Sequence, residues 1–238
     1  MKISSVQFWS LIAIILVLIA IIAPLGRLAH RQRQRLKGRP NFLKVPIPHI
    51  SLSDWHPIFK WDGLGPNVAS EVAFIGGGTL KLGTNDTETW VLAAHAKNAK
   101  HIFEIGTATG RTTYVLARNA PEDARIDTLT LPNEYEKFYY EDTPVVSKIS
   151  QHFGDSAAFD ETRFSGKMDM IFIDGCHEYD YVLSDTEKAL NMIKPGGVIF
   201  WHDYSPRMPG NFRALNELAS KLPLVHLKDT RLVACYCE

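Results

Sequence analysis

The sequence predicts an α/β protein: a mainly parallel seven-stranded sheet that ends in an antiparallel hairpin, preceded by one N-terminal transmembrane helix. Three observations support this prediction. Short apolar segments alternate with helical segments between residues 101 and 221, which is typical of parallel strands with helices on both faces. Two apolar segments, 224–228 and 232–237, close the chain and are separated only by a short polar turn. A long aliphatic run stands near the N-terminus.

That aliphatic run predicts a membrane anchor over residues 1–26. Between Val6 and Ala23 only two side chains are polar, and the segment is about as long as the shortest helix that spans a bilayer. A basic run follows: Arg27, Arg31, Arg33, Arg35, Lys37 and Arg39. The positive-inside rule then makes this a single-pass membrane protein with its main domain in the cytoplasm. The alternative is a cleaved signal peptide, but Pro24 directly follows the candidate cleavage site.

Residues 27–80 are expected to form the basic flank and an irregular linker that contains proline and tryptophan, and residues 81–238 the folded domain. Lysine plus arginine and aspartate plus glutamate number 26 each, so no global basic surface points to nucleic acid. Cys176, Cys235 and Cys237 are too few for a disulfide framework, which favours a reducing compartment. The sequence does not indicate an oligomeric state.

Within the domain, the elements are expected in a regular order. A first helix spans 86–97, and strands and helices then alternate. The polar, tyrosine-rich segment 133–142 has helical character. The expected strands are 101–106, 124–131, 148–153, 168–173, 198–202, 224–228 and 232–237, and the further helices are 109–119, 179–193 and 211–221.

The turn after the strand 101–106 indicates a ligand site. Its pattern is Glu104-x-Gly106-x-x-x-Gly110, and a helix follows, so backbone N–H groups can approach a ligand closely. The pattern is neither a dinucleotide fingerprint nor a phosphate loop with its lysine. A carboxylate at Glu104 repels a pyrophosphate and suits a cationic or hydroxyl-rich ligand, which favours S-adenosylmethionine over NAD or ATP. An ordinary turn between strand and helix remains the alternative.

Acidic residues end several of the expected strands. Glu104, Asp155, Asp174 and Asp203 all stand at or just after a strand. The carboxyl ends of parallel strands meet at one edge of a sheet, where ligands of such proteins bind. We therefore expect these four carboxylates to converge on one cleft.

Five motifs in order resemble the class I S-adenosylmethionine-dependent methyltransferases, and within them the small-molecule O-methyltransferases that include catechol and macrolide-sugar enzymes. The resemblance covers roughly residues 80–238 and implies a Rossmann-like methyltransferase domain over 81–238. Its motifs are the glycine turn, Gly154-Asp155-Ser156, Ile173-Asp174-Gly175-x-His177-x-Tyr179, Lys194-Pro195-Gly196-Gly197 and Trp201-His202-Asp203-Tyr204.

The resemblance also implies roles for single residues. Asp174 would lie between cofactor and acceptor, and Asp174 and Asp203 would hold Mg²⁺. The remaining cofactor contacts would be Glu104, Gly106, Thr107 and Gly110 at the methionine end, Thr130 at the ribose, and Asp155 and Ser156 at the adenine.

Two positions depart from the family pattern. Tyr204 stands where metal-dependent relatives have an asparagine ligand, which puts the metal in doubt, although two carboxylates and waters could still hold Mg²⁺. Thr130 stands where relatives have an acid that binds the ribose hydroxyls, so we expect weaker cofactor binding unless Glu134 takes that role.

Methyl transfer to a hydroxyl also requires a base that removes the hydroxyl proton. Methyl transfer is an in-line displacement that needs positioning of both substrates and a more nucleophilic acceptor oxygen. His177, together with Asp174, is the best candidate for the catalytic role, as the base that removes the hydroxyl proton. The plain alternative is that His177 only caps the following helix. His202 is expected to be a buried, hydrogen-bonded structural residue.

The sequence therefore predicts a methyltransferase that uses S-adenosylmethionine to methylate a hydroxyl of a small or lipid-linked acceptor. Two alternatives stay open. One is another enzyme class on the same fold, because fold alone does not fix function. The other is a non-catalytic adenosyl-binding or scaffold domain tethered to the membrane, which the departures at Thr130 and Tyr204 motivate.

Overall fold

The computed structural model describes residues 46–60, 68–73, 83–132 and 135–237. No helix within these residues is long and apolar enough to cross a membrane. The expected transmembrane anchor, the basic flank and Glu134 lie outside the described residues.

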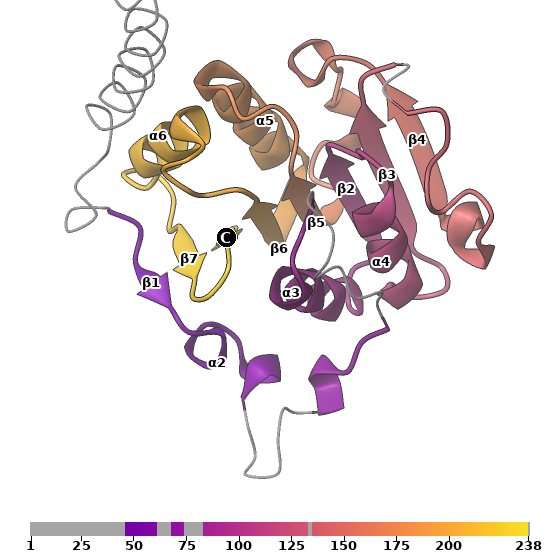
Figure 1. Cartoon of the computed structure of the whole chain (residues 1–238), viewed down its shortest axis with the longest axis horizontal. Coiled ribbons are helices and arrows are strands. Elements are labelled where there is room, and N and C mark those ends of the chain that lie inside the picture. Colours follow the sequence, from indigo (N-terminus) through magenta and orange to yellow (C-terminus); the bar gives the residue numbers. More distant parts are fainter. Residues whose placement is uncertain (1–45, 61–67, 74–82, 133–134, 238) are drawn as a thin grey trace, which may run out of the picture. The chain divides into compact units, whose positions relative to one another are not determined.

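One mixed sheet forms the centre of the domain (Figure 1). Its strand order is β1-β7-β8-β6-β5-β2-β3-β4, and only β8 runs antiparallel to its neighbours. The strands are β1 His49–Ile50, β2 His101–Ile105, β3 Arg125–Thr130, β4 Ile149–Phe153, β5 Met168–Ile173, β6 Ile193–Trp201, β7 Val225–Leu227 and β8 Val233–Tyr236.

The expectation of seven strands was one too few. The eighth, β1, comes from the segment expected to be an irregular linker and pairs in parallel with β7, His49 opposite His226. The hairpin of β7 and β8 is confirmed, but β1 covers its outer side, so it does not form the sheet edge. The segment after β1 also packs down, because Phe59 is 1% exposed and contacts the ring of Trp90 at 4.8 Å between ring centres.

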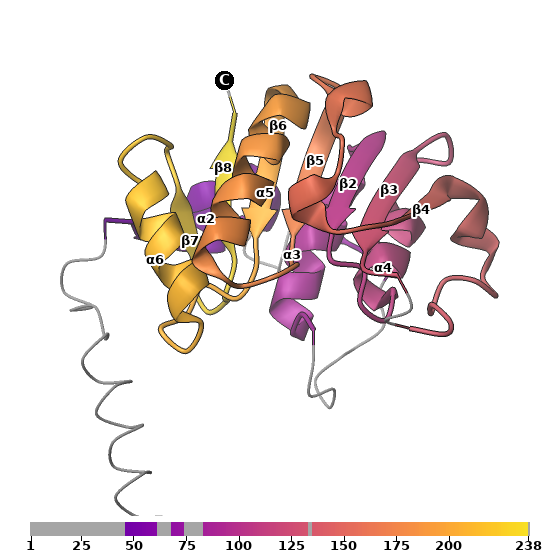
Figure 2. The same ribbon diagram turned by 90° about the horizontal axis from the view of Figure 1, so that it is seen from above.

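Helices cover both faces of the sheet (Figures 1 and 2). The pair α5 and α6 packs on one face, where Val182, Met192 and Leu215 join the core, and α3 and α4 pack on the other, where Leu92 and Leu116 do so. The helices are α2 Leu52–Trp55, α3 Asp86–Ala96, α4 Arg111–Asn119, α5 Tyr179–Met192 and α6 Pro209–Leu218; the 3-10 helices are η2 Pro57–Phe59, η3 Val68–Ser70, η4 Pro144–Lys148, η5 Ser156–Ala158 and η6 Thr162–Phe164.

The helical character predicted for 133–142 was wrong. The described part of that segment, 135–142, forms turns instead. Its aromatic rings explain the difference, because Phe138 and Tyr140 stack on each other at 5.5 Å between ring centres and both are buried. Residues two apart cannot stack on one face of a helix, so packing overrides the local pattern.

Candidate active site

A cleft of about 310 Å³ opens where β2, β3, β4 and β5 end. Among its lining residues are five that the sequence predicted as cofactor contacts: Gly106, Thr130, Asp155, Ser156 and Asp174. The structure adds two residues from the region after β5 that sequence reasoning did not assign, Cys176 and Tyr181. Of the four carboxylates expected to converge on one cleft, Asp155 and Asp174 line it, whereas Glu104 and Asp203 do not.

Gly106 allows the turn to lie against β5. Its φ of +103° is one that other residues rarely adopt, and a Cβ at this position would stand 2.1 Å from the backbone oxygen of Asp174. A glycine is therefore required here by the approach of two backbone segments to each other. This approach places Asp174 beside the glycine turn.

Glu104, Thr107 and Gly110 do not line the cleft. Glu104 is fully buried, and its Oε2 accepts hydrogen bonds from the hydroxyls of Thr113 and Thr128. The Thr107 hydroxyl is 2.7 Å from that of Thr128, so it belongs to the same buried network. Burial raises the pKa of Glu104 to about 8, which leaves this acid protonated at neutral pH.

Aromatic side chains cover Gly110. A Cβ at this glycine would stand 2.9 Å from the ring of Tyr140 and 3.0 Å from Phe138. The Tyr140 hydroxyl donates to Oε1 of Gln151 at 2.6 Å, which fixes the ring. Side chains of the same chain therefore occupy the space in which Gly110 was predicted to contact the methionine end of a cofactor.

Asp155 lines the cleft from the segment that follows β4. Its Oδ1 accepts from the backbone N–H of Ala157 at 3.0 Å and so caps η5, which begins at Ser156. Its Oδ2 accepts from the hydroxyl of Tyr181 at 3.0 Å. Tyr181 thereby ties the loop after β4 to α5, a contact that no sequence pattern indicated.

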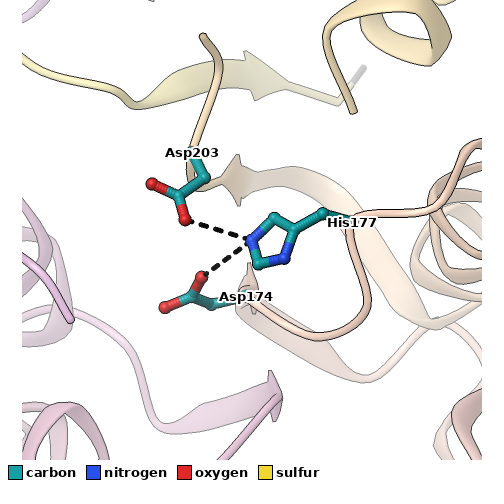
Figure 3. A group of neighbouring side chains, drawn as sticks. All are labelled: Asp174, His177 and Asp203. Carbon is teal, nitrogen blue, oxygen red and sulfur yellow. Dashed lines mark ion pairs between the residues drawn. The ribbon is translucent and has the colours of Figure 1, made fainter. Parts of the chain in front are cut away.

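Three side chains meet next to the cleft to form the ionic cluster, defined here as Asp174, His177 and Asp203 (Figure 3). Nε2 of His177 lies 3.1 Å from Oδ2 of Asp203 and 3.8 Å from Oδ1 of Asp174. The two carboxylates follow different strands, β5 and β6. Asp203 has a φ of +55°, an uncommon value for a residue with a side chain that often marks functional sites.

His202 supports the cluster from behind. Its Nδ1 is 3.0 Å from Oδ1 of Asp174 and its Nε2 is 3.0 Å from Oε2 of Glu88, and the ring is 2% exposed. The expected buried and hydrogen-bonded role of His202 is confirmed. Glu88 comes from α3, where it also forms a capping box with Asn85, so no sequence pattern indicated its contact with His202.

Arg231 closes the cluster on the side of the hairpin. Its Nη1 is 2.5 Å from Oδ1 of Asp203, and its backbone N–H donates to Oε1 of Glu88 at 2.7 Å. Arg231 stands in the turn between β7 and β8, and its contact with Asp203 was not predicted.

The charges in this region stabilise one another. Burial opposes the charge on His202, yet Asp174 and Glu88 raise the pKa of its ring to about 10. Asp174 and Asp203 likewise raise the pKa of His177 to about 9. Burial alone would raise the pKa of Asp174, but the two histidines lower it. At neutral pH both rings are therefore cations, so His177 is a base only after its proton has been displaced.

The ionic cluster fits a divalent cation. Its three ligand atoms lie within 4.8 Å of one another, and Nε2 of His177 is buried without an aligned hydrogen-bond partner among the described residues. Two carboxylates and one imidazole are an ordinary donor set for a divalent metal. Tyr204 is not part of this set, because its hydroxyl donates to Asn216 at 2.9 Å and its ring stacks on Phe212 at 4.7 Å.

A comparison with known protein families gives one match. Residues 103–204 match the family model described as "Methyltransferase domain". That range begins in β2 and ends after Asp203, so it contains the cleft and the ionic cluster. Over these residues the chain is similar to a methyltransferase domain. No curated protein matches the chain.

Solved structures share the fold. An O-methyltransferase from Streptomyces achromogenes, TomG, solved in complex with S-adenosylmethionine, has 19% identity and a TM-score of 0.55 over 67% of this chain and 83% of its own. Cofactor-bound Rv0187 from MTB has 18% identity and a TM-score of 0.55 over 71% and 85%. An O-methyltransferase from Bacillus cereus, in complex with S-adenosylhomocysteine, has 21% identity and a TM-score of 0.50 over 64% and 81%. At these identities the likeness concerns the fold.

Proposed function

We propose that this methyltransferase-like chain transfers the methyl group of S-adenosylmethionine to a hydroxyl of a small or lipid-linked acceptor. The observation that carries the proposal is the position of Asp174, which both lines the cleft and belongs to the ionic cluster. A cofactor in the cleft and an acceptor at the cluster would therefore meet at one carboxylate. The match to a methyltransferase family over the same residues supports this.

The lining of the cleft favours this cofactor over a nucleotide phosphate. No lysine, arginine or histidine is among the described residues that line it, whereas Asp155 and Asp174 are. Two carboxylates repel a phosphate and attract a ligand with a sulfonium and an ammonium group. Ser156 and Thr130 offer hydroxyls for the adenine and the ribose. Two of the similar structures hold S-adenosylmethionine or S-adenosylhomocysteine, which supports the choice.

The reaction requires the acceptor oxygen to attack the sulfonium methyl carbon in line with the breaking carbon–sulfur bond, whose electron pair leaves on sulfur. The cleft holds the cofactor and Asp174 fixes the direction of approach, which is a large part of the catalytic effect. The acceptor proton passes to the ionic cluster, whose carboxylates can accept it. His202, Glu88 and Arg231 keep these carboxylates ionised and in place.

A divalent metal would be held by Asp174, Asp203 and Nε2 of His177. As a Lewis acid it would lower the pKa of the acceptor hydroxyl. Because its binding needs the neutral ring of His177, metal affinity should fall as the pH decreases. Activity after exhaustive chelation, and again after addition of Mg²⁺ or Mn²⁺, tests whether a metal is required.

Methyl transfer is tested with cofactor carrying a labelled methyl group and a panel of phenolic, sugar and lipid-linked hydroxyl acceptors. Label in an ether product, with S-adenosylhomocysteine as the second product, supports the proposal. Cofactor cleavage without labelled acceptor would point to another enzyme class on the same fold.

A non-catalytic adenosyl-binding domain is the second candidate. Two observations favour it: Thr130 replaces the ribose-binding acid, and Tyr140 packs against Gly110 where a cofactor would approach the turn. The panel distinguishes the two, because such a domain binds S-adenosylhomocysteine in calorimetry yet labels no acceptor.

We further propose that residues 1–26 anchor the chain as a single-pass membrane protein with its domain in the cytoplasm. The apolar run between Val6 and Ala23 and the basic residues after it support this. The anchor would hold the enzyme near a lipid-linked acceptor. A chain without residues 1–40 tests that role: it should keep its turnover of a soluble acceptor and lose turnover of an acceptor in vesicles. Equal turnover of both would contradict it.

A further inference from the structure

One buried carboxyl has no role in the proposed reaction. Asp185, on α5, is fully buried, and neither of its oxygens has an aligned hydrogen-bond partner among the described residues. Burying such a group costs free energy, so native proteins rarely keep one without a use.

Asp185 lies directly behind the wall of the cleft. Its Oδ2 would be 3.7 Å from a Cβ on Gly175. The 3-10 helix η5, which begins at Ser156, packs against α5, and Tyr181, about one helical turn before Asp185, donates to Asp155, the neighbour of Ser156. The side chain of Ser156 also lowers the pKa of Asp185. Gly175 and Ser156 both line the cleft. The carboxyl therefore reaches two segments of the wall, while its complete burial keeps it from touching a ligand.

The chemistry of Asp185 and Ser156 determines which of the two can donate a hydrogen bond to the other. An ionised carboxyl only accepts hydrogen bonds, whereas a serine hydroxyl has one proton to donate and lone pairs that accept. Burial raises the pKa of Asp185 only to about 6, so the group is largely ionised at neutral pH. If the Ser156 hydroxyl donates its proton to Asp185, only lone pairs remain toward the cleft. This part of the wall would then accept a hydrogen bond but could not donate one.

We propose that Asp185 determines specificity for the adenine base by turning the Ser156 hydroxyl into an acceptor for an amino group. Adenine carries such a group, and a base with a carbonyl in its place does not. Asp185 is thus a positioning residue that acts through Ser156. The inference rests on the proposed function, since it requires the adenosyl ligand in this cleft.

The test compares two ligands at neutral pH by calorimetry of the full chain: S-adenosylhomocysteine and its deaminated analogue S-inosylhomocysteine, in which a carbonyl replaces the amino group. The wild type should bind S-adenosylhomocysteine about tenfold or more tightly, the usual effect of leaving one buried hydrogen bond unmade. Asp185→Leu and Ser156→Ala should each reduce this ratio to about threefold or less. The double variant should show no further reduction, because both changes remove the same interaction. Glu187→Leu, an exposed site on the same helix, is the control and should keep the wild-type ratio.

Each outcome decides between the two proposals. If the wild type binds neither ligand, the proposed function fails. If it binds both equally well, or if Ser156→Ala keeps the full ratio, the proposed function stands and the role of Asp185 is overturned. Ser156→Ala decides the matter even if Asp185→Leu does not fold. Independent losses in the two single variants that multiply in the double variant would also overturn it.

Discussion

A fully buried acid and a partly buried acid, on neighbouring strands or directly after them, reach opposite charge states. Glu104 lies in β2, where threonine hydroxyls are its partners and burial raises its pKa to about 8. Asp174 directly follows β5, where two histidine rings lower its pKa against the effect of burial. Burial acts on both carboxyls in the same direction, so the cations around Asp174 make the difference.

This comparison separates a structural acid, Glu104, from Asp174, the acid that we propose takes part in the reaction. The network around Glu104 is inside the domain and does not line the cleft, whereas Asp174 lines the cleft and joins the ionic cluster. A strand end alone therefore does not identify an active-site acid. What surrounds the carboxyl decides whether it is a protonated hydrogen-bond partner or a charge available to a substrate.

The largest effect should come from removing the functional charge. Asp174→Asn keeps the shape of the side chain but removes the carboxylate that the cleft and the cluster share. We expect kcat/KM to fall by about 10²–10⁴-fold, the range of a lost acid–base or charge-stabilising group. Initial rates with labelled cofactor measure this. Asp123→Asn, at an exposed acid, should leave the rate unchanged, and a loss below tenfold for Asp174→Asn would contradict the assignment.

The second prediction removes His202, the cation beside Asp174, so that the surroundings of Asp174 become more like those of Glu104, which has no cationic partner. His202→Ala leaves Glu88 fully buried without the ring that neutralises it. Loss of one partner of a buried pair costs about 3–5 kcal/mol. Urea unfolding at neutral pH measures the change. A loss below about 1 kcal/mol would mean that Arg231 alone compensates Glu88.

The structural acid should show itself in the pH dependence of stability. Glu104 has a pKa of about 8 in the folded chain, against an ordinary value of 4.5 for glutamate, so between these values the folded state holds a proton that the unfolded state has lost. The free energy of unfolding contributed by Glu104 therefore falls as the pH rises through this window. Glu104→Gln should remove a change of up to about 5 kcal/mol, since the pKa differs by about 3.5 units between the two states and one pKa unit corresponds to about 1.4 kcal/mol.

The measurement is urea unfolding of wild type and Glu104→Gln across that pH range. The two curves should approach each other at acidic pH, and the variant should be the more stable of the two at alkaline pH. Parallel curves would show that Glu104 is ionised in the folded chain, which would remove the contrast with Asp174.

The smallest effect concerns a contact at the far side of the cleft. Tyr181→Phe removes the hydroxyl that donates to Asp155 and should weaken binding of S-adenosylhomocysteine by about threefold to tenfold, the effect of one hydrogen bond. Tyr179→Phe is the matched control, since its hydroxyl donates to Glu217, which does not line the cleft. Calorimetry measures both. Equal affinities in the two variants would mean that Asp155 needs no support from α5.

The sheet could be predicted from the sequence because strands such as 168–173 and helices such as 179–193 carry clear periodicities that packing then reinforces. The strand β1 could not be predicted, because its two residues, His49 and Ile50, are too few to show a periodicity of apolar residues. Only the pairing with β7 makes them a strand. The segment 133–142 misled because its tyrosines were taken as one helical stripe, whereas Phe138 and Tyr140 pack in turns against Gly110.

The acids after the strands were predictable for the same reason that the sheet was. Asp174 and Asp203 follow apolar runs that had to be strands, and Asp155 follows the segment 148–153, which the alternation of strands and helices indicated as a strand. Their partners were not predictable. Glu88 stands in the first turn of α3, where a capping role explains it fully, and Arg231 stands in a hairpin turn. Only the fold brings Glu88 beside His202, 114 residues away, and Arg231 beside Asp203, 28 residues away, because no local pattern encodes a contact at such separations.

The most direct test of the account is a crystal structure of the chain with S-adenosylhomocysteine. We expect the adenine beside Asp155 and Ser156, and the sulfur directed toward Asp174 and the ionic cluster. A ligand bound elsewhere, or bound in the cleft with its sulfur turned away from Asp174, would contradict the account.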